Sequence, residues 1–172
     1  MPNIVIIGGG YAGFYAAFKL ERQLRKGEAT VTLIDPLPYM TYQPFLPEVA
    51  AGSIEARHVV VPHRRHLPRT RVITARVTGI NHSDKQVTVT PEFGDTFTVD
   101  YDHVVVTAGA VTRTFPIPGV ADVAIGMKTV EEAVAVRDRL IDNMHIAAHM
   151  PPGPERDRLL TVVVVGGGFA GI

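Results

Sequence analysis

Apolar and polar positions recur with two different periods at the start of the chain. Residues 3–7 and 29–34 are short runs of mostly apolar and β-branched residues, which is typical of strands buried on both faces of a parallel sheet. Between them, residues 11–26 place Phe14 and Ala17 on one face and charged side chains on the other, which predicts an amphipathic helix. A strand, a helix and a strand in this order predict a β-α-β unit with two parallel strands.

Shorter periodic segments follow in the middle of the chain. Four prolines between residues 35 and 52 predict an extended loop that ends in a short helix over residues 45–51. Residues 72–80, 86–90 and 96–99 alternate between apolar and polar positions and are separated by turn residues, so we expect a small antiparallel meander.

The last third of the chain predicts two strands and one long helix. Residues 103–107 form a buried type of strand. Thr129 and Glu132 have the spacing of a capping box, so they predict the start of a helix that ends at the Pro-Pro-Gly-Pro of residues 151–154. Residues 159–165 are apolar and predict a final strand.

An internal repeat is the strongest signal in the sequence. Residues 4–14 align with residues 162–172 at an offset of 158 positions, with six identities. Each copy is an apolar strand followed by G-x-G-x-x-G; the glycines are Gly8, Gly10 and Gly13 in the first copy and Gly166, Gly168 and Gly171 in the second. In a dinucleotide site the first glycine permits a tight turn, the second lets the backbone approach a pyrophosphate, and the third permits close helix packing. The phosphates then lie at a helix N-terminus, where N–H groups and the helix dipole favour an anion.

The first copy has a further element of a dinucleotide site. Asp35 ends the second strand, 22 residues after Gly13, where a carboxylate can accept hydrogen bonds from the ribose of an adenine nucleotide. The alternative for Asp35 is a turn residue that opens the loop before Pro36. Two such motifs in one chain suggest two dinucleotides, and a flavin with a nicotinamide electron donor is the natural pair.

Composition limits the class of protein. The 172 residues are 46% hydrophobic and 20% charged, which excludes disorder and suggests one ordinary domain, or one domain and a remnant. No apolar stretch is long enough for a membrane-spanning helix, and the amino terminus does not resemble a secretory signal. The absence of cysteine excludes a disulfide scaffold, thiolate catalysis and zinc–sulfur sites within this chain.

Charge is balanced overall but unevenly distributed. Residues 1–86 carry 11 Lys and Arg against 6 Asp and Glu, and residues 87–172 carry the reverse. Residues 56–83 contain six arginines and four histidines and no acid. We interpret this stretch as a solvated face partnered by the acidic second half. Aromatic residues do not alternate with the arginines, so the stretch does not favour nucleic-acid binding.

Four stretches carry a resemblance to a known family. They are residues 4–14 with Asp35, residues 42–52 (YQPFLPEVAAG), residues 101–109 with the later IPGV, and the second glycine motif. On these motifs the chain resembles the amino-terminal part of a type II NADH dehydrogenase, within the FAD/NAD-dependent pyridine nucleotide oxidoreductases. The resemblance runs along the whole chain but covers less than half of a family member. It implies an α/β fold: a Rossmann-like FAD-binding domain with a parallel central sheet and a small antiparallel meander.

The resemblance also assigns site residues. The positions that would hold the adenosine diphosphate half of FAD are Gly8, Gly10, Tyr11, Ala12, Gly13 and Asp35. Val77 would meet the adenine through its backbone. The turn that would pass close to the pyrophosphate or the ring system is Thr107, Ala108 and Gly109, where the family usually has Ala-Thr-Gly.

The loop of residues 42–52 is assigned to the flavin ring. Gln43 and Pro44 would lie near the isoalloxazine, with Glu48 toward the electron acceptor, although spacing alone is equally compatible with solvated loop residues. Gly166, Gly168 and Gly171 would begin the NADH or NADPH site. The implied reaction is hydride transfer from the nicotinamide to FAD and then electron transfer to a quinone or similar acceptor. In the first step no side chain need act as an acid or base.

The resemblance implies three segments. Residues 1–120 are the FAD-binding domain without its last strand, residues 121–158 are a helical connector, and residues 159–172 begin a nicotinamide nucleotide domain. In the family the FAD domain is completed after the nicotinamide domain, so we expect weak FAD binding and no NADH oxidation by this polypeptide alone. We expect a cytoplasmic protein, whose full-length relatives associate with the membrane face.

Other functions stay open at this point. The apolar strand of residues 159–165 is a pairing hazard, so the chain could be an FAD- or ADP-binding module that self-associates through it. A disulfide reductase with its cysteines in a missing domain is also compatible, as is a single-component mono-oxygenase, which the second glycine motif disfavours.

Overall fold

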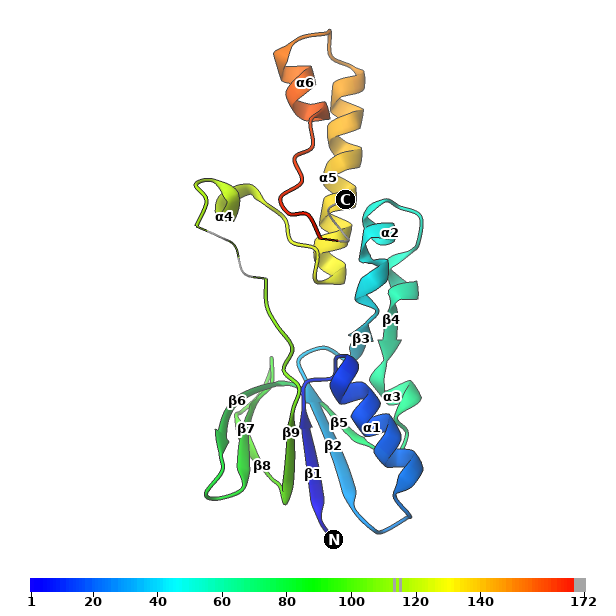
Figure 1. Cartoon of the computed structure of the whole chain (residues 1–172), viewed down its shortest axis with the longest axis vertical. Coiled ribbons are helices and arrows are strands. Elements are labelled where there is room, and N and C mark those ends of the chain that lie inside the picture. Colours follow the sequence, from blue (N-terminus) through cyan, green and yellow to red (C-terminus); the bar gives the residue numbers. More distant parts are fainter. Residues whose placement is uncertain (113, 115, 169–172) are drawn as a thin grey trace. The chain divides into compact units, whose positions relative to one another are not determined.

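The computed structural model describes residues 1–112, 114 and 116–168, which divide into two compact units (Figure 1). The first unit contains Met1–Thr41 and Val60–Ala110, and the second contains Tyr42–Val59 and the chain from Val111 onward. Each unit is described below by itself.

The first unit is built on a parallel sheet of four strands. In spatial order these are β5 (Arg71–Thr74), β2 (Thr30–Asp35), β1 (Asn3–Ile7) and β9 (His103–Val106). The central strand β1 is parallel to both neighbours, with Ile6 opposite Leu33 on one side and Val105 on the other. The predicted β-α-β unit and the parallel strand at residues 103–107 are therefore confirmed.

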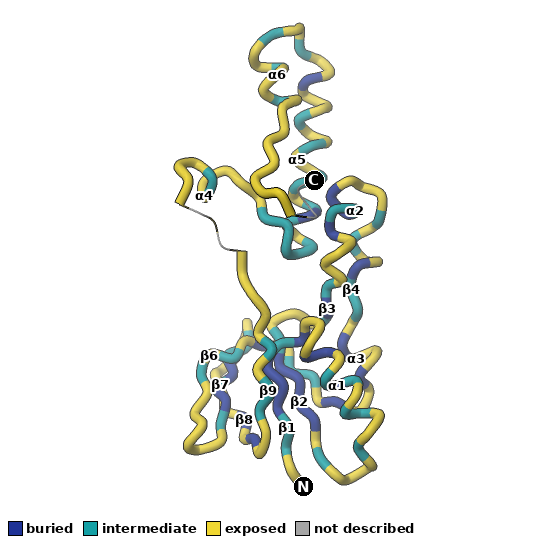
Figure 2. Tube along the Cα trace, viewed as in Figure 1, coloured by how far each residue is buried: buried dark blue, intermediate teal, exposed yellow. Residues whose placement is uncertain are grey.

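Both faces of this sheet are covered, as the apolar strand sequences predict. Helix α1 (Tyr11–Gln23) packs Phe14 and Ala17 against Ile6 and Leu33. On the other face, Val5 and Ile34 contact an antiparallel sheet of β6 (Arg76–Asn81), β7 (Gln86–Thr90) and β8 (Phe97–Asp100). Along β7 only alternate residues are buried, because successive side chains of a strand point to opposite faces. Figure 2 shows the buried residues concentrated in β1 and β2.

A short ribbon completes the first unit. Strand β3 (Tyr39–Thr41) pairs antiparallel with β4 (Val60–Pro62), and helix α3 (His63–His66) follows directly. The amide of His63 donates to the carbonyl of Pro38 at 3.0 Å, which holds the start of α3 beside the loop that follows β2. None of these three elements was predicted, because each is too short to show a period.

The second unit is helical. Its elements are the 3-10 helices η1 (Gln43–Phe45) and η2 (Ala56–Val59) and the α-helices α2 (Leu46–Ala50), α4 (Val120–Val123), α5 (Val130–Ala148) and α6 (Pro154–Leu160). Helices α2 and α5 share a core that includes Leu46, Val49 and Ala133. The predicted capping box is confirmed: the Thr129 hydroxyl accepts from the Glu132 amide at 3.1 Å, and the Glu132 carboxylate accepts from the Thr129 amide at 3.0 Å.

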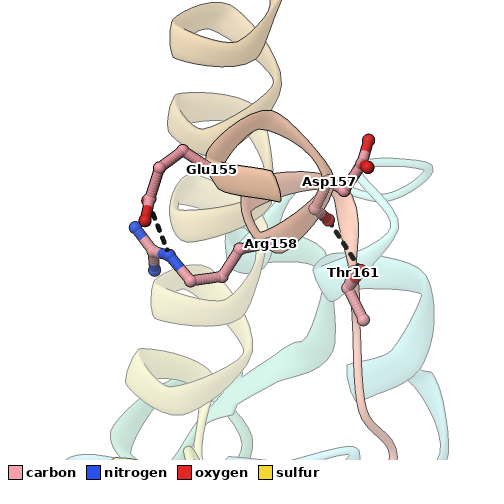
Figure 3. Close-up of polar contacts among 4 residues, drawn as sticks. All are labelled: Glu155, Asp157, Arg158 and Thr161. Carbon is pink, nitrogen blue, oxygen red and sulfur yellow. Dashed lines mark hydrogen bonds and ion pairs between the residues drawn. The ribbon is translucent and has the colours of Figure 1, made fainter. Parts of the chain in front are cut away.

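Polar contacts within helix α6 and at its C-terminal end are shown in Figure 3. Glu155 and Arg158 form an ion pair at 3.1 Å on the exposed surface. The Thr161 hydroxyl donates to the carbonyl of Asp157 at 2.7 Å and so satisfies one free carbonyl of the last turn. No helix in the described part of the chain is both long and apolar enough to cross a membrane.

The predicted meander is wrong at its first strand. Residues 72–80 form two strands that belong to different sheets: β5 joins the parallel sheet and β6 joins the antiparallel one. The chain changes sheets at Ala75, which is buried and whose amide donates to the carbonyl of Asp35 at 2.9 Å. A period of two shows that a segment is extended, but it does not show which sheet the segment joins.

The predicted final strand is also wrong. Leu159 and Leu160 end helix α6, and residues 161–168 carry no helix or strand. A buried parallel strand is stable only when it pairs with neighbours, and no described strand pairs with this segment. The side chains of Val162–Val165 are accordingly 59–77% exposed.

Candidate dinucleotide-binding site

The carboxyl ends of the parallel strands gather the predicted site residues of the first unit. Strand β1 leads into Gly8, β2 ends at Asp35, and β9 leads into Thr107. In the sheet, β2 is the neighbour of β1 on one side and β9 is its neighbour on the other side, so the connections from β1 diverge at this strand. Open α/β sheets bind their ligands at such a switch point, in the crevice outside the carboxyl ends of the strands.

Two glycines of the first motif are required by the protein's own packing. A Cβ at Gly13 would collide with the carbonyl of Gly8 and would lie 2.6 Å from the Thr107 hydroxyl. Gly8 has φ +97°, a left-handed conformation, and a Cβ there would collide with the carbonyl of Thr107. Helix α1 can therefore begin directly against the ends of β1 and β9.

Gly10 differs from these two glycines. Its φ is −69°, which any residue adopts, and a Cβ built on it meets nothing within 4 Å. Gly10 is the N-cap of α1, has no side chain to cap the helix, and is exposed together with Tyr11 and Ala12. The positive end of the helix dipole therefore faces an open region.

Asp35 lies beside this loop and is held by two backbone amides. Its Oδ2 accepts from the amide of Gly9 at 2.5 Å, and its Oδ1 accepts from the amide of Leu37 at 2.7 Å. Asp35 thus acts in the protein both as a turn residue and as a support of the glycine loop. A carboxylate has about four acceptor positions, so it retains capacity for hydroxyl donors.

Thr107 fastens β9 to the glycine loop. Its hydroxyl oxygen lies 2.9 Å from the carbonyl oxygens of both Ile7 and Gly8, which share its single proton, and its amide also donates to the carbonyl of Ile7. Ala108 and Gly109 follow and are exposed, with Gly109 at φ +70°. The Thr107 side chain is therefore directed at the loop backbone and supports the loop from within.

An open cavity of about 540 Å³ lies next to Asp35 at the same edge of the sheet. Its walls include Pro36, Thr74 and Arg76, from the ends of β2 and β5 and the start of β6. Val77, the residue assigned to the adenine, follows Arg76 in β6 and is half-buried.

A second cavity of about 550 Å³ lies at the opposite edge. It is lined by the strand starts Asn3, Thr30 and Arg71, and by Arg69. The Arg69 guanidinium already donates to the carbonyl of Leu24, at 2.9 Å, and to that of Glu21. Arg69 thereby caps the end of α1, so this cavity has a structural explanation and lies at the wrong edge for a dinucleotide.

The residues assigned to the flavin ring lie in the second unit. Gln43 and Pro44 form the exposed helix η1, and the Gln43 amide donates to the carbonyl of Lys128 at 3.3 Å. Glu48 lies in α2, and its Oε2 is buried without a hydrogen-bond partner among the described residues.

The second glycine motif forms no described site. Gly166 has φ +126° and Gly168 is exposed, but neither follows a strand. Gly171 lies outside the described residues.

His63 is a site residue that the sequence did not single out. Its side chain is fully buried, and its Nε2 lies 2.8 Å from the carbonyl oxygen of Gly9. Burial lowers the pKa of His63, against smaller opposing effects of the Gly9 hydrogen bond and the Asp35 charge. In the sequence it was one of four histidines within a basic stretch, and no pattern separated it from the exposed ones.

The fold and this edge of the sheet have the arrangement that is typical of dinucleotide-binding α/β domains. Residues 2–172 match the sequence profile of the family described as pyridine nucleotide-disulphide oxidoreductase, so the chain belongs to that family. It is 36% identical to the external NADH-ubiquinone oxidoreductase 2 of Saccharomyces cerevisiae, over 99% of this chain and 32% of that protein. It is 32% identical to the type II NADH:quinone oxidoreductase Ndh of Mycobacterium tuberculosis, over 99% of this chain and 36% of that protein.

Solved structures agree with the predicted fold class. The NDH2 of Plasmodium falciparum in complex with NADH superposes with a TM-score of 0.76 at 26% identity, over 86% of this chain and 30% of that one. The α/β fold with a parallel sheet and a small antiparallel sheet is therefore confirmed, as is the resemblance to type II NADH dehydrogenases. The chain spans about a third of the length of the curated relatives it matches.

Replacing Thr107 tests the support of the loop. In Thr107→Val the side chain keeps its shape but the carbonyl of Gly8 loses its donor, so we expect the free energy of unfolding to fall by about 1–2 kcal/mol. Thr107→Ser keeps the hydroxyl and should lose less than half as much. Urea unfolding followed by circular dichroism measures both variants, and equal losses would contradict the role of the hydroxyl.

The lowered pKa of His63 predicts a pH dependence of stability. The unfolded chain binds a proton at His63 near pH 6.5, whereas the folded chain binds it only at lower pH, so the unfolded state holds more protons in between. The contribution of the neutral His63 to the free energy of unfolding is therefore fully present above about pH 6.5 and is lost as the pH falls below that value. Urea unfolding at pH 7.5 and 5.5 should show a smaller loss for His63→Gln than for the unaltered chain, and equal losses would contradict the assignment.

Proposed function

We propose that the chain binds the adenosine diphosphate half of FAD at the carboxyl edge of its parallel sheet and forms the FAD domain of an NADH:quinone oxidoreductase. The observation that carries this proposal is the open backbone at Gly10. Gly8 and Gly13 are glycines because a Cβ would strike the protein itself, but nothing in the described protein needs a glycine at position 10. A pyrophosphate lying against the backbone there accounts for it.

Charge and hydrogen-bonding capacity support the same ligand. The N-terminus of α1, a helix of 13 residues, presents its positive dipole end beside Gly10. Asp35 accepts from the amide of Gly9, the residue before Gly10, and it can also accept from the ribose hydroxyls. Arg76, which lines the open cavity together with Pro36, directly precedes Val77, the residue assigned to the adenine. The residues present therefore fit a dinucleotide.

The relatives supply the proposed reaction. They are NADH-ubiquinone and NADH:quinone oxidoreductases, and FAD, when bound, accepts a hydride and passes electrons on. In this proposal the chain's own residues bind and orient the cofactor, with Gln43 and Pro44 near its ring system. Gly166, Gly168 and Gly171 begin the site for NADH or NADPH. Because the chain spans about a third of these relatives, we propose weak FAD binding and no NADH turnover by the 172 residues alone.

Gly10→Ala tests the proposed ligand site. The added methyl group meets nothing in the described protein, so the free energy of unfolding should fall by no more than about 1 kcal/mol, the cost of alanine in place of glycine at an N-cap. It would occupy the space assigned to the pyrophosphate, so the affinity for ADP should fall at least about tenfold, measured by isothermal titration calorimetry. Gly79→Ala, in β6, is the matched control and should bind ADP normally. Full ADP affinity in Gly10→Ala would contradict the proposed site.

Self-association through residues 162–165 is a second candidate function, favoured by the exposure of four consecutive valines. A second copy of the chain would cover this apolar run. Replacing Val163 and Val164 by Thr should then shift the mass measured by light scattering from dimer to monomer. A monomer for the unaltered chain at about 100 μM would contradict this candidate.

A further inference from the structure

His63 is buried directly behind the glycine loop. It is the first residue of α3, its side chain is fully buried, and its ring stacks on Phe14 of α1 at a centroid distance of 6.2 Å and an interplanar angle of 30°. Neither the family relationship nor the proposed chemistry assigns a role to it. A buried imidazole is costly unless its polar atoms are used, so its contacts need an explanation.

The contact with Gly9 determines which ring nitrogen carries the proton. The Nε2 atom lies 2.8 Å from the carbonyl oxygen of Gly9, and a carbonyl can only accept. Nε2 is therefore the donor, and in the neutral ring Nδ1 is unprotonated. Nδ1 is buried and has no partner among the described residues, so a second proton there would be an unsatisfied buried donor.

This hydrogen bond fixes the direction of the next amide. The carbonyl of Gly9 and the amide of Gly10 belong to one peptide group, and the peptide bonds of the described residues are trans. In a trans peptide the C=O and N–H bonds point in opposite directions. Because His63 holds the carbonyl toward the interior, the Gly10 N–H points away from the interior, toward the open side of the loop.

Gly9 is thus held on both of its polar groups. The Asp35 carboxylate accepts from its amide at 2.5 Å, and His63 donates to its carbonyl. The ring also leaves no room for a side chain at position 9: a Cβ there would lie 2.7 Å from Nε2 and closer still to the neighbouring ring carbon. His63 therefore explains why the variable position of G-x-G is a glycine in this chain.

We propose that His63 is a positioning residue of the nucleotide site, which orients the Gly9–Gly10 peptide so that the Gly10 N–H donates to the pyrophosphate of a bound adenine dinucleotide. The inference rests on the proposed function, because it assumes that the loop binds such a ligand. It adds a residue that touches no ligand and acts through the loop backbone. Orienting the donor before the ligand arrives saves the cost of ordering it on binding.

Two substitutions separate the hydrogen bond from mere filling of the core. His63→Leu keeps an apolar side chain under Phe14 but removes the donor to Gly9. His63→Gln places an amide N–H group that can donate to the same carbonyl. We expect ADP affinity to fall at least about tenfold in His63→Leu and to stay within about threefold of the unaltered chain in His63→Gln.

His66→Leu is the matched control. His66 lies on the same short helix and contacts the same Phe14 ring, at a centroid distance of 6.4 Å and an interplanar angle of 72°, but it is exposed, and the ring that would meet a Cβ at Gly9 is that of His63. Its replacement should leave ADP affinity unchanged. Titration calorimetry with ADP on the 172-residue chain gives the affinities, and circular dichroism shows whether each variant is folded.

A spectroscopic measurement without ligand covers the case in which His63→Leu fails to fold. Long-range ¹H–¹⁵N spectra of the unaltered chain at pH 7.5 should show His63 protonated at Nε2 and unprotonated at Nδ1. In His63→Gln the Gly10 amide resonance should stay close to its original position. The opposite tautomer, or a His63 ring in fast exchange with solvent, would overturn the inference.

The binding results distinguish the two levels of the proposal. No ADP or FAD binding by the unaltered chain contradicts the proposed function and, with it, the role of His63. Normal binding by the unaltered chain and by His63→Leu contradicts the role of His63 alone. Loss of affinity in His63→Leu with recovery in His63→Gln supports it.

Discussion

The close approach of helix α1 to the ends of β1 and β9 is the constraint on which the site depends. It requires glycine at positions 8 and 13, where a Cβ would strike backbone atoms, and it uses the Thr107 hydroxyl to hold the two strand ends together. Because α1 begins so close to the sheet, its N-terminus opens at the switch point between β2 and β9. The place where an anion can bind is thus a consequence of packing.

Some backbone polar groups of the glycine loop form hydrogen bonds within the protein, and others face the open side of the loop. The Asp35 carboxylate accepts a hydrogen bond from the amide of Gly9, and the His63 ring donates one to the carbonyl of Gly9. Gly10 keeps an exposed backbone that the protein itself does not fill. A loop whose inner hydrogen bonds are satisfied is rigid, and a rigid loop can present its remaining amides to a phosphate at little entropic cost.

The sequence was sufficient to predict the elements that are long enough to show a hydrophobic period, and the glycine motif. The β-α-β unit and the capping box at Thr129 follow from local patterns. The place of Thr107 close to the glycine motif was implied by the family resemblance and not by a local pattern. Residues 72–80 were misread because alternation does not identify the partner strand, and residues 159–165 because an apolar run becomes a strand only when it is paired. His63 was missed because its role depends on β4 and α3, which are too short to show a period.

The central claim is that the backbone around Gly10 is the binding surface for an adenine dinucleotide. Titration of the ¹⁵N-labelled chain with ADP, followed by amide chemical shifts, tests it most directly. We predict that the largest shifts fall on Gly9, Gly10, Ala12 and the residues following Asp35. Shifts confined to the cavity at the opposite edge of the sheet, around Thr30 and Arg71, or no shifts at millimolar ADP, would contradict the account.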